Sequence, residues 1–167
     1  KHLSRLKGGG LARLAAPADC RALILSDVLD DDLSVIASGP TVPDETTFRD
    51  AVEVLRSNKI WDEAPVSVKK YLDEGADGKH PETAKPGDPF FATCRSTLVG
   101  SNSISVDAVM RTAVEKGYKP VLYSRNICGE ARTQAVRMAA YVKEIMDRGI
   151  SKPVAVIAGG ETTVTLK

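Results

Sequence analysis

Residues 97–123 read TLVGSNSISVDAVMRTAVEKGYKPVLY, and this stretch decides the fold class. Its ends, 97–99 and 120–123, are short apolar runs typical of buried strands. Between them, apolar residues recur over 106–113 at the i, i+3, i+4, i+7 spacing of one helix face, and Gly117 follows as a helix end. A strand, a helix and a second strand in this order predict parallel strands joined by a right-handed crossover.

The same alternation extends along the chain. Two further buried strands are expected at 22–25 and 154–158, and an alternating strand pattern occupies 163–167. Three further helices are expected at 48–55, 64–72 and 131–145. Asp44 or Thr46 is the expected N-cap of the first, and Gly75 and Gly149 are expected to end the other two. The predicted fold class is α/β, with three-layer α/β/α parts and a mainly parallel sheet.

One segment has the composition of a linker. Residues 76–89 combine Gly, Pro and mixed charges with few apolar side chains. We therefore expect 1–75 to be the C-terminal part of a first α/β domain and 90–167 the N-terminal part of a second. Because the chain starts in a helix-like segment and stops in a strand pattern, it is interpreted as an internal piece of a longer polypeptide, whose remainder is its partner.

Composition excludes several function classes. The 167 residues carry 23 basic and 22 acidic side chains, a net charge of +1, which argues against a nucleic-acid surface. No apolar run approaches the roughly 20 residues of a membrane span. Three widely spaced cysteines, Cys20, Cys94 and Cys128, favour a reducing cytoplasm over a disulfide framework. His2 and His80 are the only histidines, so a Ser-His-Asp triad or a His-based metal site is not expected.

The loop SDVLDDDLSVIASGPTVPD (26–44) follows an apolar strand, where open α/β sheets bind ligands. Asp27 and Asp31 are candidate Mg²⁺ ligands because that ion prefers carboxylates and water. Candidate donors to a phosphate are Ser38, Gly39 and Thr41. Alternatively, the acids 30–32 only favour the start of a short helix through the helix dipole.

Glycine-rich segments offer further candidates, although no G-x-x-x-x-G-K-[ST] or strand-linked G-x-G-x-x-G motif is present. Residues 7–10, KGGG, are either an anion-binding nest or a flexible break between helices. Residues 159–163, GGETT, are either a close approach to a ligand or a bulge. Ser101 with Asn102 is either a helix cap or a ligand contact. Glu130 is interpreted as an acid in the first turn of a helix.

Six segments in sequence order resemble one family: KHLSRLKGGGLA (1–12), LILSDVLDDDLSVIASGPTVPD (23–44), KPGDP (85–89), GSN (100–102), GEA (129–131) and GGETTVT (159–165). Together they closely resemble the glycerate 2-kinase family, also named putative hydroxypyruvate reductases, whose members have a Rossmann-like first domain and a C-terminal MOFRL domain. The resemblance implies ATP-dependent, Mg²⁺-assisted phosphorylation of glycerate to 2-phosphoglycerate in a cleft between two domains.

The resemblance also assigns site residues. Asp27 resembles an acidic position of the family's motif and is the expected catalytic residue; together with Asp31 it is also the metal ligand expected from the loop itself. The substrate- or nucleotide-binding residues that the resemblance implies are Ser26, Ser38, Gly39, Pro40, Thr41, Gly159, Gly160, Glu161 and Thr162. The remaining alternatives are a nicotinamide-dependent hydroxypyruvate reductase and a non-catalytic relative that binds a phosphorylated ligand.

Two positions depart from the family pattern. Asp30 stands where the family has glycine, and Ala158 where it has serine. A Cβ at position 30 is expected to exclude a positive φ, and Ala158 removes a hydroxyl. The family's Ser-Gly-Gly loop and catalytic lysine correspond to positions before Lys1, and its Gly-Gly-Arg-Asn segment to positions after Lys167. The chain alone is therefore expected to be inactive.

Overall fold

The computed structural model describes residues 1–150 and 153–166, which form two compact units. The first unit contains residues 1–24 and 32–97, and the second contains residues 25–31 and those from 98 onward. The predicted α/β class with parallel strands is confirmed. The division differs from the predicted one, however, because residues 76–89 belong to the first unit. The assignment of the two parts to two domains of a whole protein stays a prediction.

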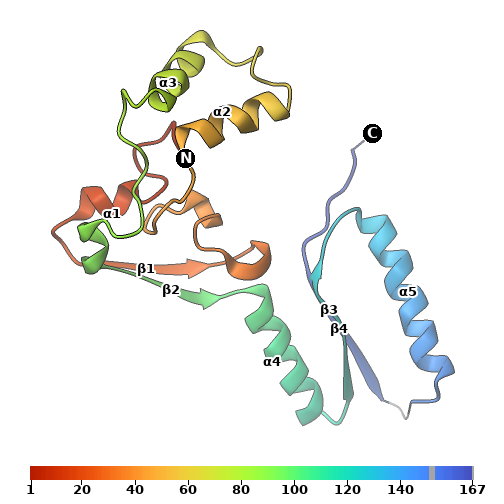
Figure 1. The fold of residues 1–167 in the computed structure, drawn as a ribbon. Coiled ribbons are helices and arrows are strands. Elements are labelled where there is room, and N and C mark those ends of the chain that lie inside the picture. The colour runs from red at the N-terminus through yellow and green to blue at the C-terminus, as the bar shows by residue number, and fades with distance from the viewer. Residues whose placement is uncertain (151–152, 167) are drawn as a thin grey trace. The chain divides into compact units, whose positions relative to one another are not determined.

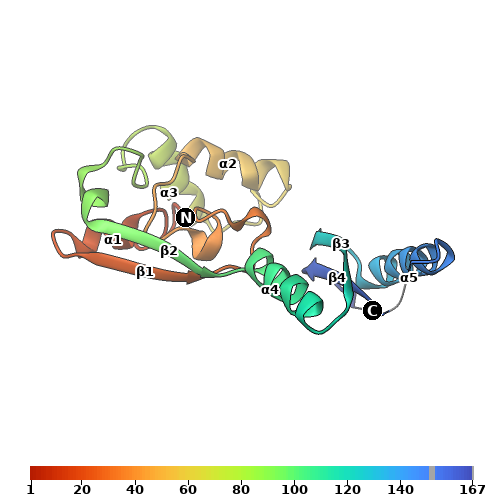
Figure 2. The ribbon, with the colours of Figure 1, turned by 90° about the horizontal axis from the view of Figure 1, so that it is seen from below.

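The second unit is built around two parallel strands, β3 (Lys119–Ile127) and β4 (Val154–Gly160). Helices α4 (Asn102–Glu115) and α5 (Ala131–Asp147) lie on opposite sides of this pair (Figures 1 and 2). Buried Val106, Ala113 and Ile157 pack α4 against β4. Ser101 caps α4 by accepting from the backbone N–H of Ile104 at 3.3 Å, which confirms the predicted cap.

The first unit contains most of β1 (Cys20–Leu25) and most of β2 (Cys94–Gly100), which pair and run in the same direction (Figure 1). It also contains the helices α1 (Gly10–Ala15), α2 (Phe48–Ser57) and α3 (Val66–Ala76). Short 3₁₀ turns occupy Ile36–Ser38 and Pro89–Thr93 in this unit, and Leu29–Asp31 in the second unit. The core lies between α2 and α3, where Phe48, Val52 and Leu72 are buried together.

The N-cap of α2 differs from both predicted residues. Thr47 caps the helix, and its hydroxyl and backbone form a capping box with Asp50. Asp44 is buried instead, with only 1% of its surface exposed, and accepts from Lys1 Nζ at 2.9 Å. The acid therefore joins the start of the chain to the loop before α2.

Gly75 does not end α3, as the sequence predicted, but lies inside it. A Cβ at this position would lie 2.3 Å from Cδ1 of Phe48, a ring that is only 2% exposed. The glycine therefore allows α2 and α3 to approach closely. Gly117 and Gly149 do follow their helices with φ of 79° and 66°, as predicted.

We expect Gly75→Ala to lower the free energy of unfolding by about 2 kcal/mol, because the buried Phe48 ring has to move. This value already includes the opposing gain in helix propensity, because alanine stabilises a helix more than glycine does. Asp73→Ala, an exposed position in the same helix, is the control and should change stability by less than about 0.5 kcal/mol. Urea unfolding of both variants measures the difference, and equal stability would show that α2 and α3 adjust freely.

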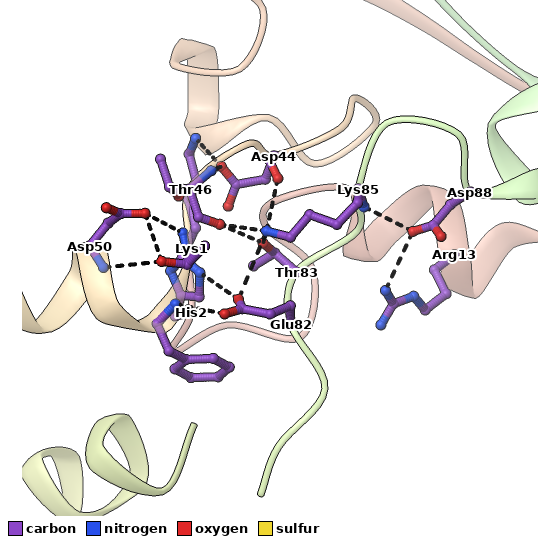
Figure 3. Close-up of polar contacts among 12 residues, drawn as sticks. Lys1, His2, Arg13, Asp44, Thr46, Asp50, Glu82, Thr83, Lys85 and Asp88 are labelled. Carbon is purple, nitrogen blue, oxygen red and sulfur yellow. Dashed lines mark hydrogen bonds and ion pairs between the residues drawn. The ribbon is translucent and has the colours of Figure 1, made fainter. Parts of the chain in front are cut away.

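The segment predicted as a linker is fastened to the first unit (Figure 3). Ala84 is 1% exposed, donates to the Gly8 carbonyl at 3.0 Å and accepts from Asp44 N at 2.8 Å. Lys85 Nζ donates to the carbonyls of Asp44 and Thr46. Polar, Gly- and Pro-rich composition is common to linkers and to ordered loops, so composition alone does not distinguish the two.

Candidate functional site

A cavity of about 380 Å³ lies wholly within the second unit, where polar loops follow the strands. One side is formed by residues 25–31, which follow β1, and another by the start of α4. Asn126 and the end of β4 complete it. The predicted site residues that line this cavity are Ser26, Asp27, Asp31, Gly160 and Glu161.

The loop after β1 carries Asp27 into this cavity. Ser26 N donates to the Gly100 carbonyl at 2.9 Å, which continues the alignment of β1 with β2. The Ser26 hydroxyl accepts from Val28 N at 3.2 Å, so it orders the loop locally. Asp27 is exposed and lines the cavity. Its carboxylate makes no hydrogen bond or ion pair with the residues that the structure describes, which leaves it available to a ligand.

The backbone at Asp30 contradicts the expectation that a side chain at this position excludes a positive φ. It has φ 64° and ψ 8°, and Asp31 has φ 55°, so both adopt the left-handed conformation. Aspartate tolerates this region better than most residues because its short side chain can hydrogen-bond locally. Asn126 Nδ2 donates to Asp30 Oδ1 at 3.4 Å. The fold at position 30 is therefore preserved, and the effect of the substitution is an added carboxylate in the cavity.

The segment after β4 does not form the strand predicted over 163–167, in the part that the structure describes. It runs beside residues 127–131 instead, where Glu161 N donates to the Ile127 carbonyl and Thr163 N to the Gly129 carbonyl, both at 2.9 Å. Gly160 has φ 139°, and a Cβ there would lie 2.2 Å from the Ile127 carbonyl oxygen. Gly160 is thus required for this close approach.

Glu130 holds a neighbouring segment in place, in addition to its position at the start of α5. Its carboxylate accepts from the backbone N–H and the hydroxyl of Thr165, at 3.2 and 2.9 Å, and so holds the segment after β4. Of the predicted residues in this segment, Gly160 and Glu161 line the cavity. Gly159 instead contacts the Asn102 side chain, and Thr162 is exposed and outside the set that lines the cavity.

The predicted residues Ser38, Gly39, Pro40 and Thr41 belong to the first unit. Their carbonyls hold the start of the chain, since Gly8 N donates to Ser38 O at 2.9 Å and Gly9 N to Gly39 O at 2.7 Å. Pro40 O accepts from the backbone N–H groups at the start of α1. The Thr41 hydroxyl is buried and shares a 2.9 Å hydrogen bond with that of Ser96. A role of these four residues in ligand binding stays a prediction.

These hydrogen bonds also decide between the two interpretations of residues 7–10, and neither is right. Gly8 and Gly9 have φ of 57° and 75° and are buried. Their backbone N–H groups already donate to carbonyls, so they do not form an open nest for an anion. Gly8 and Gly9 thus connect the N-terminal segment of the chain to residues 38–40. No local sequence pattern predicts this contact between distant segments.

Sequence reasoning missed part of the site. Asn126, near the end of β3, and Ser103 and Ser105, in α4, line the cavity beside Ser101 and Asn102. Asn126 could have been found with the rule used for Asp27, because it also lies at the carboxyl end of a parallel strand. The serines could not, since their orientation depends on how α4 packs.

Four carboxylates line the cavity, those of Asp27, Asp30, Asp31 and Glu161, and no Lys, Arg or His side chain does so. Within the described residues there is no group of three or more His, Cys, Asp or Glu side chains close enough to hold a metal ion by themselves. The predicted pair of metal ligands, Asp27 and Asp31, therefore lines one cavity without forming a complete metal cage. In the described parts of the chain, moreover, no helix has the length and apolar character needed to span a membrane.

Comparison with known proteins shows which proteins the chain resembles. Residues 1–73 match a family model described as a domain of unknown function, DUF4147. The chain is 40% identical to a glycerate 2-kinase from Pyrococcus horikoshii. The match covers the whole chain and 38% of the length of that protein. Over its whole length the chain is thus homologous to part of the glycerate 2-kinases. A protein named putative hydroxypyruvate reductase from Agrobacterium vitis is 39% identical over 99% of the chain and 36% of its own length.

Structural comparison gives the same result. The crystal structure of a glycerate kinase from Thermotoga maritima matches the whole chain with a TM-score of 0.78 and 38% identity. The match covers 38% of that protein. The chain thus spans less than half the length of the curated relatives that it matches.

Proposed function

We propose that the chain carries part of the active site of a kinase that transfers a phosphoryl group from ATP to the 2-hydroxyl of glycerate. The observation that carries this proposal is the 40% identity to a glycerate 2-kinase across the whole chain. The cavity in the second unit supports it, because it brings five of the predicted site residues together at strand ends. Phosphoryl transfer depends on positioning and charge neutralisation, which fits a cavity without cysteine or histidine nucleophiles.

Asp27 is the residue to which we assign the central role. It is exposed in the cavity directly behind β1, without a hydrogen-bond partner among the described residues. Its carboxylate is able to accept the proton of the glycerate hydroxyl or to hold Mg²⁺ beside the transferred group. Glu161, whose backbone is fixed by the Ile127 carbonyl, presents a second acid to the same space.

The oxygen-rich lining fits Mg²⁺, which binds one or two carboxylates and completes its shell with water and phosphate oxygens. Asp27 and Asp31 are the proposed ligands. When bound, the ion neutralises charge on the phosphates. Four carboxylates and no cationic side chain line this cavity, so it repels phosphates. Phosphate binding therefore requires Mg²⁺ or basic groups from elsewhere in the protein.

The remaining predicted residues take supporting roles in this proposal. Gly160 permits close approach of the backbone, and Gly159 and Thr162 flank it. Ser38, Gly39, Pro40 and Thr41 are proposed to bind substrate or nucleotide from the first unit. Their carbonyl contacts with residues 8–12 make this loop rigid, which is a requirement for a preorganised binding surface.

The proposal is tested with the full-length protein, D-glycerate, ATP and Mg²⁺, by measuring ADP release and identifying the product by phosphorus NMR. We expect 2-phosphoglycerate. Formation of 3-phosphoglycerate would keep the kinase and reject the position of transfer, whereas the absence of any phosphorylated product would reject the kinase.

The name of the Agrobacterium vitis relative favours one second candidate, a hydroxypyruvate reductase. Such an enzyme needs a nicotinamide cofactor, and the sequence contains no G-x-G-x-x-G fingerprint after a strand. Oxidation of NADH by the full-length protein with hydroxypyruvate would support the reductase. We expect no NADH oxidation.

Asp30 gives a prediction specific to this chain. Asp30→Gly removes a carboxylate from the cavity and keeps the left-handed backbone, which glycine adopts without strain. We expect the KM for ATP to fall about fivefold, the effect of removing about 1 kcal/mol of repulsion between like charges. Steady-state kinetics of the full-length variant measures it. Asp30→Asn should reproduce most of the change, and an unchanged KM in both variants would contradict the proposed repulsion.

A further inference from the structure

Asn102, the first residue of α4, joins three elements at the edge of the cavity. Its side-chain Nδ2 donates to the backbone carbonyl of Arg125 in β3. Its Oδ1 lies against β4, since a Cβ built on Gly159 would be 2.2 Å from that oxygen. Asn102 also lines the cavity itself. One side chain therefore contacts both strands of the sheet from the start of the helix.

Arg125 strengthens the same connection from the strand. Its guanidinium forms an ion pair with Asp107 in α4, and Nη1 donates to the Ser103 carbonyl at 3.4 Å. The Arg125 main chain is thus held by Asn102 and its side chain by the following turn of the same helix. These contacts fix the first two turns of α4 to the carboxyl end of β3.

This connection lies where the sheet is least regular. The pairing of β3 with β4 shifts register between Leu122 and Ser124, and again between Ser124 and Ile127. Residues 125 and 126 have no register partner in β4, so regular ladder pairing does not determine their position. The Arg125 carbonyl lies within this irregular part, and it is the atom to which Asn102 donates.

The irregular part of β3 in turn positions the segment that carries Glu161. Ile127, two residues beyond Arg125, accepts from Glu161 N at 2.9 Å and is the register partner of Gly160. Displacement of the Arg125 carbonyl would therefore move Ile127 and, through it, Glu161. Asn102 lies at the beginning of this chain of contacts.

We propose that Asn102 is a positioning residue that fixes the carboxyl ends of β3 and β4, and so the Glu161 segment, against the cavity. The inference rests on the proposed function for its effect on turnover, although the effect on the Glu161 segment is independent of it. The structure assigns the role to the side-chain amide, which supplies a donor for the Arg125 carbonyl and a short, flat oxygen edge for Gly159.

The test uses the full-length protein carrying Asn102→Ala, and Asn102→Asp as a variant of equal size that replaces the donor by an acceptor. Thr112→Ala, an exposed position of the same helix, is the matched control. We expect both Asn102 variants to lower kcat about 30-fold with little change in the KM for glycerate, because small displacements of a catalytic group are costly. Amide hydrogen exchange at Glu161 and Thr163 should accelerate about tenfold or more in both, and not in the control.

The two measurements separate this inference from the proposed function. If the wild-type protein does not phosphorylate glycerate, the kinase proposal fails, and faster exchange at Glu161 still supports the positioning role. If kcat falls while exchange at Glu161 and Thr163 stays at the wild-type rate, Asn102 acts on the ligand directly and the inference is overturned. Wild-type kcat and exchange in both variants would also overturn it. If Asn102→Ala does not fold, Asn102→Asp decides alone.

Discussion

Asp27→Asn is expected to lower the kcat of the full-length protein for glycerate phosphorylation on the order of 10²-fold or more. Asparagine keeps the size of the side chain and loses the negative charge, so it neither accepts the substrate proton nor neutralises a metal ion. A loss of this size is typical when a positioned acid–base group is removed. Asp27 makes no hydrogen bond to the described residues, so the substitution should leave the loop after β1 intact.

Asp32, seven residues after the end of β1, offers a matched control. Asp32 is an exposed acid whose Oδ1 accepts from Ser34 N at 2.8 Å, an interaction that an asparagine oxygen can also make. Asp32→Asn should therefore keep kcat within about twofold of wild type. Coupled measurement of ADP release gives both values, and circular dichroism confirms folding. A folded Asp27→Asn variant with wild-type kcat would remove Asp27 from the catalytic role.

The elements of this fold could be predicted because each depends on local periodicity. The four buried strands that the sequence predicts all exist, whereas the strand predicted over 163–167 does not form in its described part. The four helices with a clear 3.6-residue pattern lie within a few residues of their predicted ranges. The loop after β1 and the end of β4 were recognised as site candidates because parallel strands bring their carboxyl ends to one edge. Five of those residues do line one cavity.

The errors have a common physical cause, which is contact between segments distant in sequence. The sequence predicts Gly75 as a helix end because glycine commonly occupies that place, yet its role is set by Phe48, 27 positions earlier in the chain. The composition of residues 76–89 is typical of a linker, but their attachment to the first unit depends on the distant carbonyls of Gly8, Asp44 and Thr46. Asn126 does not share this cause, because its place near the carboxyl end of β3 follows from the position of the strand alone.

The polar contacts around Asp44 in the first unit show how much such distant contacts are expected to contribute to stability (Figure 3). Asp44 Oδ1 accepts from Lys1 Nζ at 2.9 Å and from the Thr46 hydroxyl at 2.8 Å, while the acid is 1% exposed. Burial alone would raise the pKa of Asp44, but the hydrogen bonds from Lys1 and Thr46 outweigh it and lower the pKa from 3.8 to about 2. At about 1.4 kcal/mol per pKa unit, this corresponds to about 2 kcal/mol of stability at neutral pH.

Asp44→Ala is expected to lower the free energy of unfolding by about 3 kcal/mol at pH 7, because it also leaves Lys1 and Thr46 without their acceptor. Since the pKa is lower in the folded state, the contribution of Asp44 is complete above about pH 4 and is lost as the pH falls toward 2. The difference in stability between the wild type and the variant should therefore be constant from pH 7 to about 5 and shrink below pH 4.

Urea unfolding of both proteins at several pH values measures this difference. Glu45→Ala removes the neighbouring exposed acid and should change stability by less than about 0.5 kcal/mol at any of them. Lys1→Met removes the cationic partner and should raise the pKa of Asp44, which would move the loss of stability to higher pH. A difference between the wild type and Asp44→Ala that stays unchanged down to pH 2 would show that the carboxylate contributes through packing rather than through its charge.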